Sequence, residues 1–388
     1  MPVGEVCSSI SDTYREKKNM VTLINTSDVL EGRVLNHERV PNSNLKGQFK
    51  KTFQRDDILY SEIRPQNRRF AYVDFSPIDY IASTKLMVIR AKKDVVSPKY
   101  LYYFLKNSST VAELQLLAET RSGTFPQITF SEVANLTIPV PSLAVQEVIV
   151  QTMQCLEDKI TCNEQINDNL EQQAQAIYHE RFETISPNDL PSEWRIVTLG
   201  EVATISNKSF NPLKEPEILL EHYSIPAFDE ARFPVFELST SIKSNKFIID
   251  ASCFMISKLN PTTKRVWKPY CLTGNAVCST EFIVYKAKDK TITDFLYSVI
   301  DSNSFSDFMC SHVTGSTGSR QRTTPSDTLS YELTLPSEDE LAEFQSLVSP
   351  MYAQIRINAI ENDRLKRLRD SLLPKLMSGE IDVSTIQL

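Results

Sequence analysis

Basic and polar side chains gather at equivalent places in the two halves of this chain. They could contact nucleic acid, because arginine, lysine, glutamine and threonine reach base edges in the major groove and the phosphates beside it. In each half a basic stretch is followed by a polar loop that contains glycine. In the first half the candidate DNA-binding residues are Arg64, Arg68, Arg69, Arg121, Thr124 and Gln127. In the second half they are Lys258, Lys264, Arg265, Lys268, Arg320, Gln321 and Arg322.

Each candidate also has a plain structural interpretation, because polar loop residues often belong to a solvated surface. The recurrence of both sets favours nucleic-acid contact for the sets as a whole. The formal net charge of -7 argues against a generic basic binder. It leaves room for local basic patches, or for a partner that supplies more positive surface.

Motifs for catalysis and metal binding are missing from the sequence. The nine glycines form neither GxGxxG nor GxxxxGK[ST], and HExxH, GxSxG and Asn-Pro-Pro-aromatic runs are absent. Seven cysteines and four histidines show no metal-ligand spacing. We therefore predict no catalytic residue, no metal site and no cofactor for this chain. A nuclease site assembled from scattered carboxylates remains an alternative.

The two halves repeat one another. "STKLMVIRAK" at 83–92 returns as "STEFIVYKAK" at 279–288, and Ser61 matches Ser257 at the same offset of 196 residues. An ordered series at a spacing this long indicates two homologous domains rather than a solenoid. Within each half, β-type runs precede a short helical stretch, which predicts a mixed α/β domain. Further matched pairs are GEV at 4–6 and 200–202, Pro65 and Pro261, and Ser131 and Ser326.

A long helix follows each domain. Leu143 to Phe182 contains neither proline nor glycine, and its apolar residues step by four and three, with Asn163 and Asn167 on the same seam. Antiparallel pairing with an equivalent second helix would bring the asparagines together and fix the register. Solvated asparagines on unpaired helices are the alternative.

The second helix fits the seam less well. Arg369 replaces an apolar residue, and Pro350 is expected to kink or restart the helix. The residues predicted to pair the helices are Ile160, Asn163, Asn167, Leu170, Ile355, Asn358, Asn362 and Leu365.

These elements predict an α+β fold in which two homologous mixed α/β domains are separated by two long antiparallel helices, a coiled coil with pseudo-twofold symmetry. Ile381–Ile386 should pack against the first domain, so that the tail lies near the N-terminus. No apolar leader is evident, and we expect a cytoplasmic protein. The predicted segments are a first domain (1–142), a central helix (143–182), a linker and second domain (183–337), a distal helix (338–378) and a tail (379–388).

Three stretches resemble the specificity subunits of type I restriction–modification systems. They are "GTFPQITFSEVANLTIPVPS" (123–142), "LPSEWRIVTLGEVATIS" (190–206) and "RLRDSLLPKLMSGEI" (367–381). The chain departs from the family pattern where a tryptophan-containing lead-in would precede Gly4, and in the loop "GSRQRTTPSD".

The resemblance implies a non-catalytic subunit whose two target-recognition domains each read half of a bipartite, asymmetric site in double-stranded DNA. It further implies that the helices dock two methyltransferase subunits and that restriction subunits join the complex. S-adenosylmethionine, ATP and Mg²⁺ would then be bound by the partner subunits. A coiled-coil scaffold joining two protein-binding domains is an alternative that the sequence leaves open.

Overall fold

The computed structural model describes residues 1–16, 18–42, 47–120, 126–186, 189–314 and 321–383. The chain divides into two compact units. Unit 1 comprises Met1–Ile160 and Leu365–Leu388, and unit 2 comprises Thr161–Arg364. Two long helices, α5 (Leu143–Tyr178) and α11 (Glu338–Ser378), therefore each contribute residues to both units.

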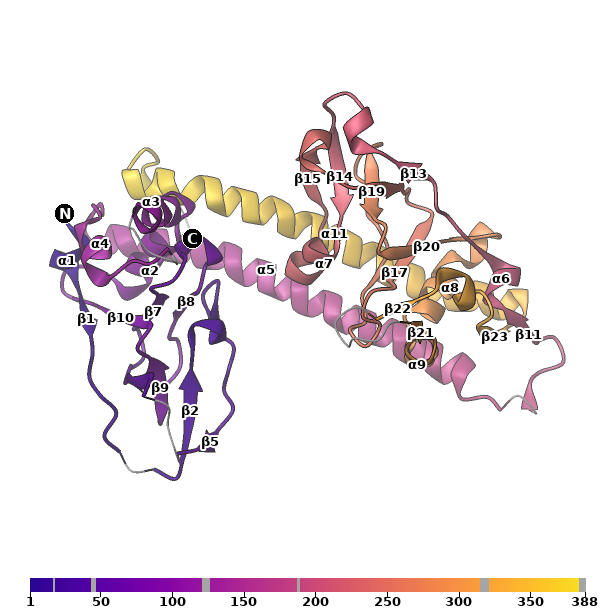
Figure 1. Ribbon diagram of the computed structural model, residues 1–388, viewed down its shortest axis with the longest axis horizontal. Coiled ribbons are helices and arrows are strands. Elements are labelled where there is room, and N and C mark those ends of the chain that lie inside the picture. The colour runs from indigo at the N-terminus through magenta and orange to yellow at the C-terminus, as the bar shows by residue number, and fades with distance from the viewer. Residues whose placement is uncertain (17, 43–46, 121–125, 187–188, 315–320, 384–388) are drawn as a thin grey trace. The chain divides into compact units, whose positions relative to one another are not determined.

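The centre of unit 1 is an antiparallel sheet in the order β1-β10-β7-β8 (Figure 1). Alternate residues of β7 enter two different cores, Ile58 and Tyr60 on the helical side and Leu59 on the side of a second sheet. Burial on both faces explains why this strand reads as a continuous apolar run. The strands are β1 (Cys7–Ile10), β7 (Ile58–Ser61), β8 (Phe70–Tyr72) and β10 (Leu86–Ala91).

The second sheet of unit 1 has the order β5-β2-β9-β6, with β2 and β9 parallel. Its strands are β2 (Met20–Ile24), β5 (Val40–Pro41), β6 (Phe49–Lys51) and β9 (Tyr80–Ser83), and a small hairpin joins β3 (Val29–Leu30) to β4 (Arg33–Val34). The helices are α1 (Val3–Val6), α2 (Pro98–Lys106), α3 (Ser108–Glu119) and α4 (Phe130–Asn135), with short 3-10 turns η1 (Thr26–Asp28) and η2 (Pro65–Asn67).

Unit 2 repeats this plan. Its central sheet has the order β12-β20-β17-β18, and its second sheet has the order β13-β16-β19-β14-β15, again with one parallel pair, β14 with β19. The strands of the central sheet are β12 (Ala203–Ile205), β17 (Cys253–Ser257), β18 (Val266–Trp267) and β20 (Phe282–Ala287). Those of the second sheet are β13 (Ser209–Phe210), β14 (Leu219–Tyr223), β15 (Val235–Leu238), β16 (Lys246–Ile248) and β19 (Ala276–Ser279).

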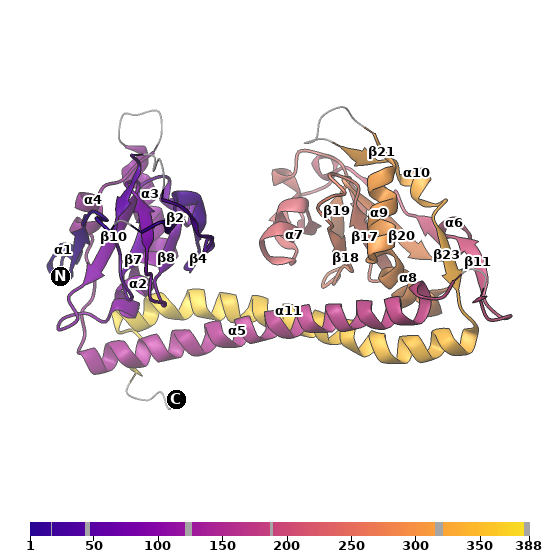
Figure 2. The same ribbon diagram turned by 90° about the horizontal axis from the view of Figure 1, so that it is seen from below.

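Two strand pairs complete unit 2: β11 (Arg195–Thr198) with β23 (Glu332–Leu335), and β21 (Val313–Thr314) with β22 (Arg322–Thr323). The helices are α6 (Leu199–Val202), α7 (Ile225–Ala231), α8 (Thr293–Ile300), α9 (Asn303–Ser311) and α10 (Pro325–Thr328), with 3-10 turns η5 (Pro212–Lys214), η6 (Ser239–Ser241) and η7 (Lys290–Ile292). In each unit one helix packs between the central sheet and the long helices. This helix is α2 in unit 1 and α8 in unit 2 (Figure 2).

The duplication extends to close packing at glycine. A Cβ on Gly4 of α1 would lie 3.0 Å from Ala134 Cβ, and one on Gly200 of α6 would lie 3.2 Å from the Leu329 carbonyl oxygen. Each glycine thus lets a short helix approach the segment that follows the polar loop. The common strand order and this shared contact confirm the predicted internal repeat.

The long helices begin where polar caps precede them. The Ser142 hydroxyl accepts from Val145 N (3.4 Å), and the Ser337 hydroxyl accepts from Glu340 N (3.4 Å). Helix α5 ends at Tyr178 and continues as a π-helical turn, His179–Glu183. Helix α11 is followed by Gly379 with a left-handed φ of 77°.

The expectation that Pro350 restarts the second helix is wrong, because α11 is continuous through this residue. Proline removes one helical hydrogen bond and costs about 3 kcal/mol. On either side of it Phe344, Val348 and Tyr352 are buried in the core of unit 2, and this packing holds the helix across the proline.

The tail takes part in the core of unit 1. Ile381 and Val383 pack in the same cluster as Val3 and Val6 of α1. The remaining residues of the predicted contact, 384–386, lie outside the described part of the chain. No helix within the described ranges is both long and apolar enough to span a membrane.

Candidate nucleic-acid interface

A compact turn in unit 1 joins strand β7 to the end of the polar loop. The Ser61 hydroxyl accepts from Ile63 N (3.0 Å), and Ile63 pairs with Gln127 in an antiparallel bridge. Arg64 has a left-handed φ of 45° and its backbone N–H donates to the Pro126 carbonyl (3.1 Å). The structure therefore brings two predicted DNA-binding residues, Arg64 and Gln127, to one place.

The same turn recurs in unit 2. The Ser257 hydroxyl accepts from Leu259 N (3.2 Å), and Leu259 pairs with Arg322 in an antiparallel bridge. Asn260 has a left-handed φ of 49° and its N–H donates to the Gln321 carbonyl (2.9 Å). Because Lys258 precedes Leu259 directly, three predicted residues, Lys258, Gln321 and Arg322, meet at the base of this loop.

Charged side chains beside each turn form a small cluster. In unit 1, Lys85 Nζ lies 3.6 Å from Glu62 Oε2 and donates to Gln127 Oε1 (3.4 Å). In unit 2, Glu281 accepts from both Nε (2.9 Å) and Nη2 (3.0 Å) of Arg322.

Hydrogen bonds from Arg322 hold the pKa of Glu281 below its ordinary value; partial burial opposes the shift, and the charge of Lys258 adds to it. Glu62, Lys85 and Glu281 are not among the residues predicted from the sequence. The signal was present, because the repeated segments "YSEIRP" and "STK" in one half read "ISKLNP" and "STE" in the other, with the charges reversed.

Other predicted residues brace the fold instead. Arg68 Nη2 donates to the Ser108 hydroxyl at the start of α3 (2.8 Å), and Arg69 Nη1 donates to the Ser27 carbonyl (3.0 Å). These contacts fasten the basic stretch of unit 1 to neighbouring elements.

The matching cations of unit 2 hold acidic partners. Lys264 Nζ pairs with Asp301 (2.9 Å), Arg265 binds Asp229 through two nitrogens (2.6 and 2.9 Å), and Lys268 pairs with Asp294. Three further candidates, Arg121, Thr124 and Arg320, lie outside the residues that the structure describes.

Unit 1 also carries exposed basic residues outside the predicted set. The backbone joins Tyr14 N to the Lys50 carbonyl (2.8 Å), and the Asn42 side chain donates to the Lys18 carbonyl (2.8 Å). Arg15, Lys18 and Lys50 are exposed. We call these three residues the basic ribbon. Their recurrence signal is weak, because the equivalent loops of unit 2 differ in length.

The predicted asparagines of the helical seam face one another in unit 2. Asn163 Nδ2 donates to Asn362 Oδ1 (2.9 Å) and to Glu361 Oε2 (2.7 Å), while Asn358 Nδ2 donates to Asn167 Oδ1 (2.8 Å). As one residue number rises by four its partner's falls by four, so α5 and α11 run antiparallel here. Among the other predicted pairing residues, Ile160 is buried, and Leu170, Ile355 and Leu365 are half-buried.

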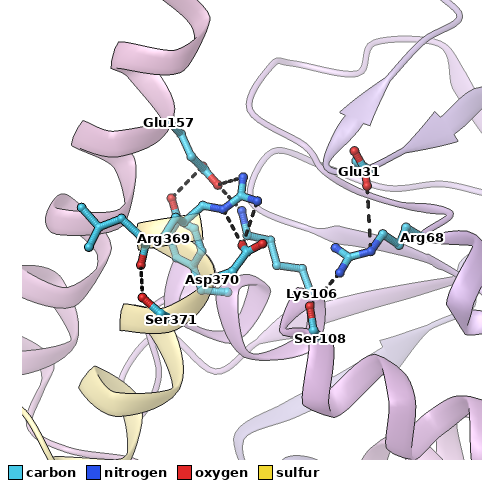
Figure 3. A network of polar contacts seen from close by, with 10 residues as sticks. Glu31, Arg68, Lys106, Ser108, Glu157, Arg369, Asp370 and Ser371 are labelled. Atoms are coloured by element: carbon cyan, nitrogen blue, oxygen red, sulfur yellow. Dashed lines mark hydrogen bonds and ion pairs between the residues drawn. The ribbon is translucent and has the colours of Figure 1, made fainter. Parts of the chain in front are cut away.

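Arg369, which interrupts the apolar seam, belongs to a polar network in unit 1 (Figure 3). Its guanidinium lies 3.9 Å from Glu157 Oε1 of α5 and 2.8 Å from Asp370. Glu157 also pairs with Lys106 of α2 and accepts from the Tyr103 hydroxyl (2.9 Å). Burial lowers the pKa of Lys106, and Glu157 opposes that shift. The network thus fastens α2 of unit 1 to both long helices.

Metal chemistry has no evident site here: within the ranges that the structure describes, no three His, Cys, Asp or Glu side chains are grouped to hold an ion. The chemistry available at the loop bases is hydrogen bonding by preorganised Arg, Lys and Gln side chains.

Comparison with known proteins agrees with this arrangement. A model of the type I restriction modification DNA specificity domain matches residues 1–172. The HindI specificity subunit of Haemophilus influenzae is 28% identical over 449 residues, which covers 93% of this chain and 94% of the relative. The MjaIX specificity subunit of Methanocaldococcus jannaschii is 25% identical over 348 residues, covering 80% and 77%.

A solved structure shares the fold. The crystal structure of the S subunit of a type I restriction-modification system from M. genitalium superimposes with a TM-score of 0.53 at 15% identity, covering 97% of this chain and 95% of that one. The duplicated domains, the paired helices and these relatives point the same way. The chain is similar over nearly its whole length to type I restriction–modification specificity subunits, and residues 1–172 match the DNA specificity domain of that family.

Proposed function

We propose that this chain is the DNA sequence-recognition subunit of a type I restriction–modification complex, in which each unit reads one half of a bipartite, asymmetric site in double-stranded DNA. The observation that carries the proposal is the duplicated loop base, where one backbone arrangement presents Gln127 in unit 1 and Arg322 in unit 2. One design with two different polar surfaces suits two half-sites of different sequence.

The proposal assigns catalysis to partner subunits. Two methyltransferase subunits dock on α5 and α11, and restriction subunits join this assembly in the cytoplasm. S-adenosylmethionine, ATP and Mg²⁺ are then bound by those partners. Exposed apolar side chains on the long helices support a docking role, namely Ile166 on α5 and Leu347, Ile357 and Leu368 on α11.

The test is to purify the protein from its native cells and to identify and count the chains that accompany it. Two copies of an adenine methyltransferase per chain, together with modified bases at a bipartite sequence in that genome, are the expected result. A chain that purifies without a methyltransferase and binds no DNA would point to a scaffold. Mg²⁺-dependent cleavage by the isolated chain would point to a nuclease.

A further inference from the structure

The backbone at the two loop bases is nearly the same, hydrogen bond by hydrogen bond. Glu62 N donates to the Lys85 carbonyl (3.0 Å), as Lys258 N donates to the Glu281 carbonyl (2.9 Å). The Glu62 carbonyl accepts from Ile128 N (2.8 Å), and the Lys258 carbonyl accepts from Thr323 N (3.1 Å). On this shared backbone the two units carry different side chains, and three of the matched positions form one polar cluster beside the turn. The unit 1 triad is Glu62, Lys85 and Gln127, and the unit 2 triad is Lys258, Glu281 and Arg322.

In unit 2 the acidic residue fixes the orientation of the arginine. Glu281 accepts from Nε and Nη2 along one side of the planar Arg322 guanidinium. Two donors at its end, Nη1–H and the second Nη2–H, are not used by this contact. They form the fork that matches O6 and N7 of guanine. The Arg322 side chain is 42% exposed, so this end can meet a ligand.

In unit 1 the position that matches Glu281 is occupied by Lys85, so the residue at position 127 has a basic neighbour instead of an acidic one. Lys85 donates to Gln127 Oε1, which orients the amide. An arginine at position 127 would be repelled by Lys85, whereas glutamine is neutral and carries both an acceptor and donors. Such an amide pairs with N6 and N7 of adenine.

From these contacts we infer that position 127 in unit 1 and position 322 in unit 2 determine one base each: Gln127 reads an adenine in one half-site and Arg322 a guanine in the other. Glu281 and Lys85 are positioning residues: Glu281 fixes the orientation of the Arg322 guanidinium, and Lys85 fixes that of the Gln127 amide. The inference rests on the proposed function and assigns to it the bases read at two positions.

The test uses the full chain with the proteins that co-purify with it, and selection from a randomised duplex DNA library. Arg322→Gln should lower the preference for guanine at one position of one half-site on the order of 10- to 100-fold, with the other half-site unchanged. Glu281→Gln, which keeps the arginine but weakens its clamp, should cause a smaller loss at that same position. Arg181→Gln removes another arginine–glutamate pair of unit 2, with Glu343 at 2.9 Å, and should leave the selected sequence unchanged.

A transplant gives a gain of specificity that a misfolded variant cannot mimic. The triple change Glu62→Lys, Lys85→Glu and Gln127→Arg installs the unit 2 triad in unit 1. It should replace adenine by guanine at one position of the half-site read by unit 1.

Each other outcome overturns the inference. Uniform weakening on all sequences with a shallower salt dependence would make Arg322 a phosphate contact. If the wild type selects a bipartite sequence and the variants select the same one, only the base assignment fails. If the wild type selects no sequence at all, the proposed function fails with it.

Discussion

Asn163 of α5 and Asn362 of α11 are joined by an amide hydrogen bond of 2.9 Å in a buried position of unit 2. Together with the neighbouring pair Asn167 and Asn358, these amides are less favourable than leucines at the same positions, but they restrict the helices to one register.

Asn362→Leu should lower the free energy of unfolding by about 1–3 kcal/mol, because it leaves the buried amide of Asn163 facing a leucine. The double variant Asn163→Leu/Asn362→Leu should recover part of this loss, since both buried amides are then gone and only Glu361, which also accepts from Asn163, loses a partner. Urea unfolding measures the cycle. Gln165→Leu, on the exposed side of α5, is the control and should change little. A double variant less stable than either single one would contradict the argument.

Glu157→Leu should destabilise the protein by about 2–4 kcal/mol. Only 12% of the Lys106 side chain is exposed, so loss of its counter-charge leaves a nearly buried ammonium group without a partner carboxylate. The expected destabilisation is smaller than for a fully buried ion pair, because 30% of the Glu157 side chain is exposed to solvent. The pKa of Lys106 should fall further. Lys106→Met in the same chain should restore stability. Glu147→Leu, on the exposed side of α5, serves as the control.

Asp250 should contribute stability that depends on pH in the acid range. Burial raises its pKa, but hydrogen bonds from Lys286 and Ser252 outweigh burial and bring it to about 2, against an ordinary value of 3.8. Because the folded-state pKa is depressed, the contribution is present above about pH 5 and is lost as the pH falls towards 2. The gap in urea midpoint between wild type and Asp250→Asn should therefore close over this range. In the Lys286→Met background, the difference in urea midpoint that Asp250→Asn causes should also be smaller. A difference that does not change with pH would refute the depressed pKa of Asp250.

The double change Arg15→Ala/Lys50→Ala in the basic ribbon should weaken DNA binding equally for all sequences. If both side chains contact phosphates, the slope of log affinity against log salt should become shallower by about 2. Fluorescence anisotropy of a labelled duplex over a salt series measures this. Lys92→Ala/Lys93→Ala removes the same charge elsewhere in unit 1 and should leave the slope unchanged. A change in base preference without a change in slope would argue for direct readout instead.

The parts of the fold that follow a short period could be predicted from the sequence. Steps of three and four place Asn163 and Asn362 on the seam, and the structure pairs them. The repeat of "STKLMVIRAK" likewise identified one central strand in each domain, β10 and β20.

Pairing between distant segments could not be predicted, because no period records it. Lys264 and Arg265 looked available for DNA, yet their acidic partners Asp301 and Asp229 lie 37 and 36 residues away in the chain. Arg369 interrupts the apolar pattern of the seam, and the sequence does not show why. In the folded chain its guanidinium lies near Glu157, which also pairs with Lys106 of α2. The second sheet of each unit could not be predicted as a sheet, because it pairs strands far apart in the chain, such as the parallel neighbours β2 and β9.

Unit 1 is built from both ends of the chain, and this affects the order in which the protein can fold during synthesis. Leu373, Leu376 and Met377 of α11 lie in the same core as Val3 of α1 and Met153 of α5. A ribosome therefore produces all of residues 161–364 before the side chains that complete this core exist. Unit 2, encoded without interruption, can fold first, while the first domain waits with apolar surface uncovered and exposed to aggregation or to chaperones. A nonsense mutation in the last third of α11 would therefore remove part of the core of unit 1, although every residue of unit 2 would still be made.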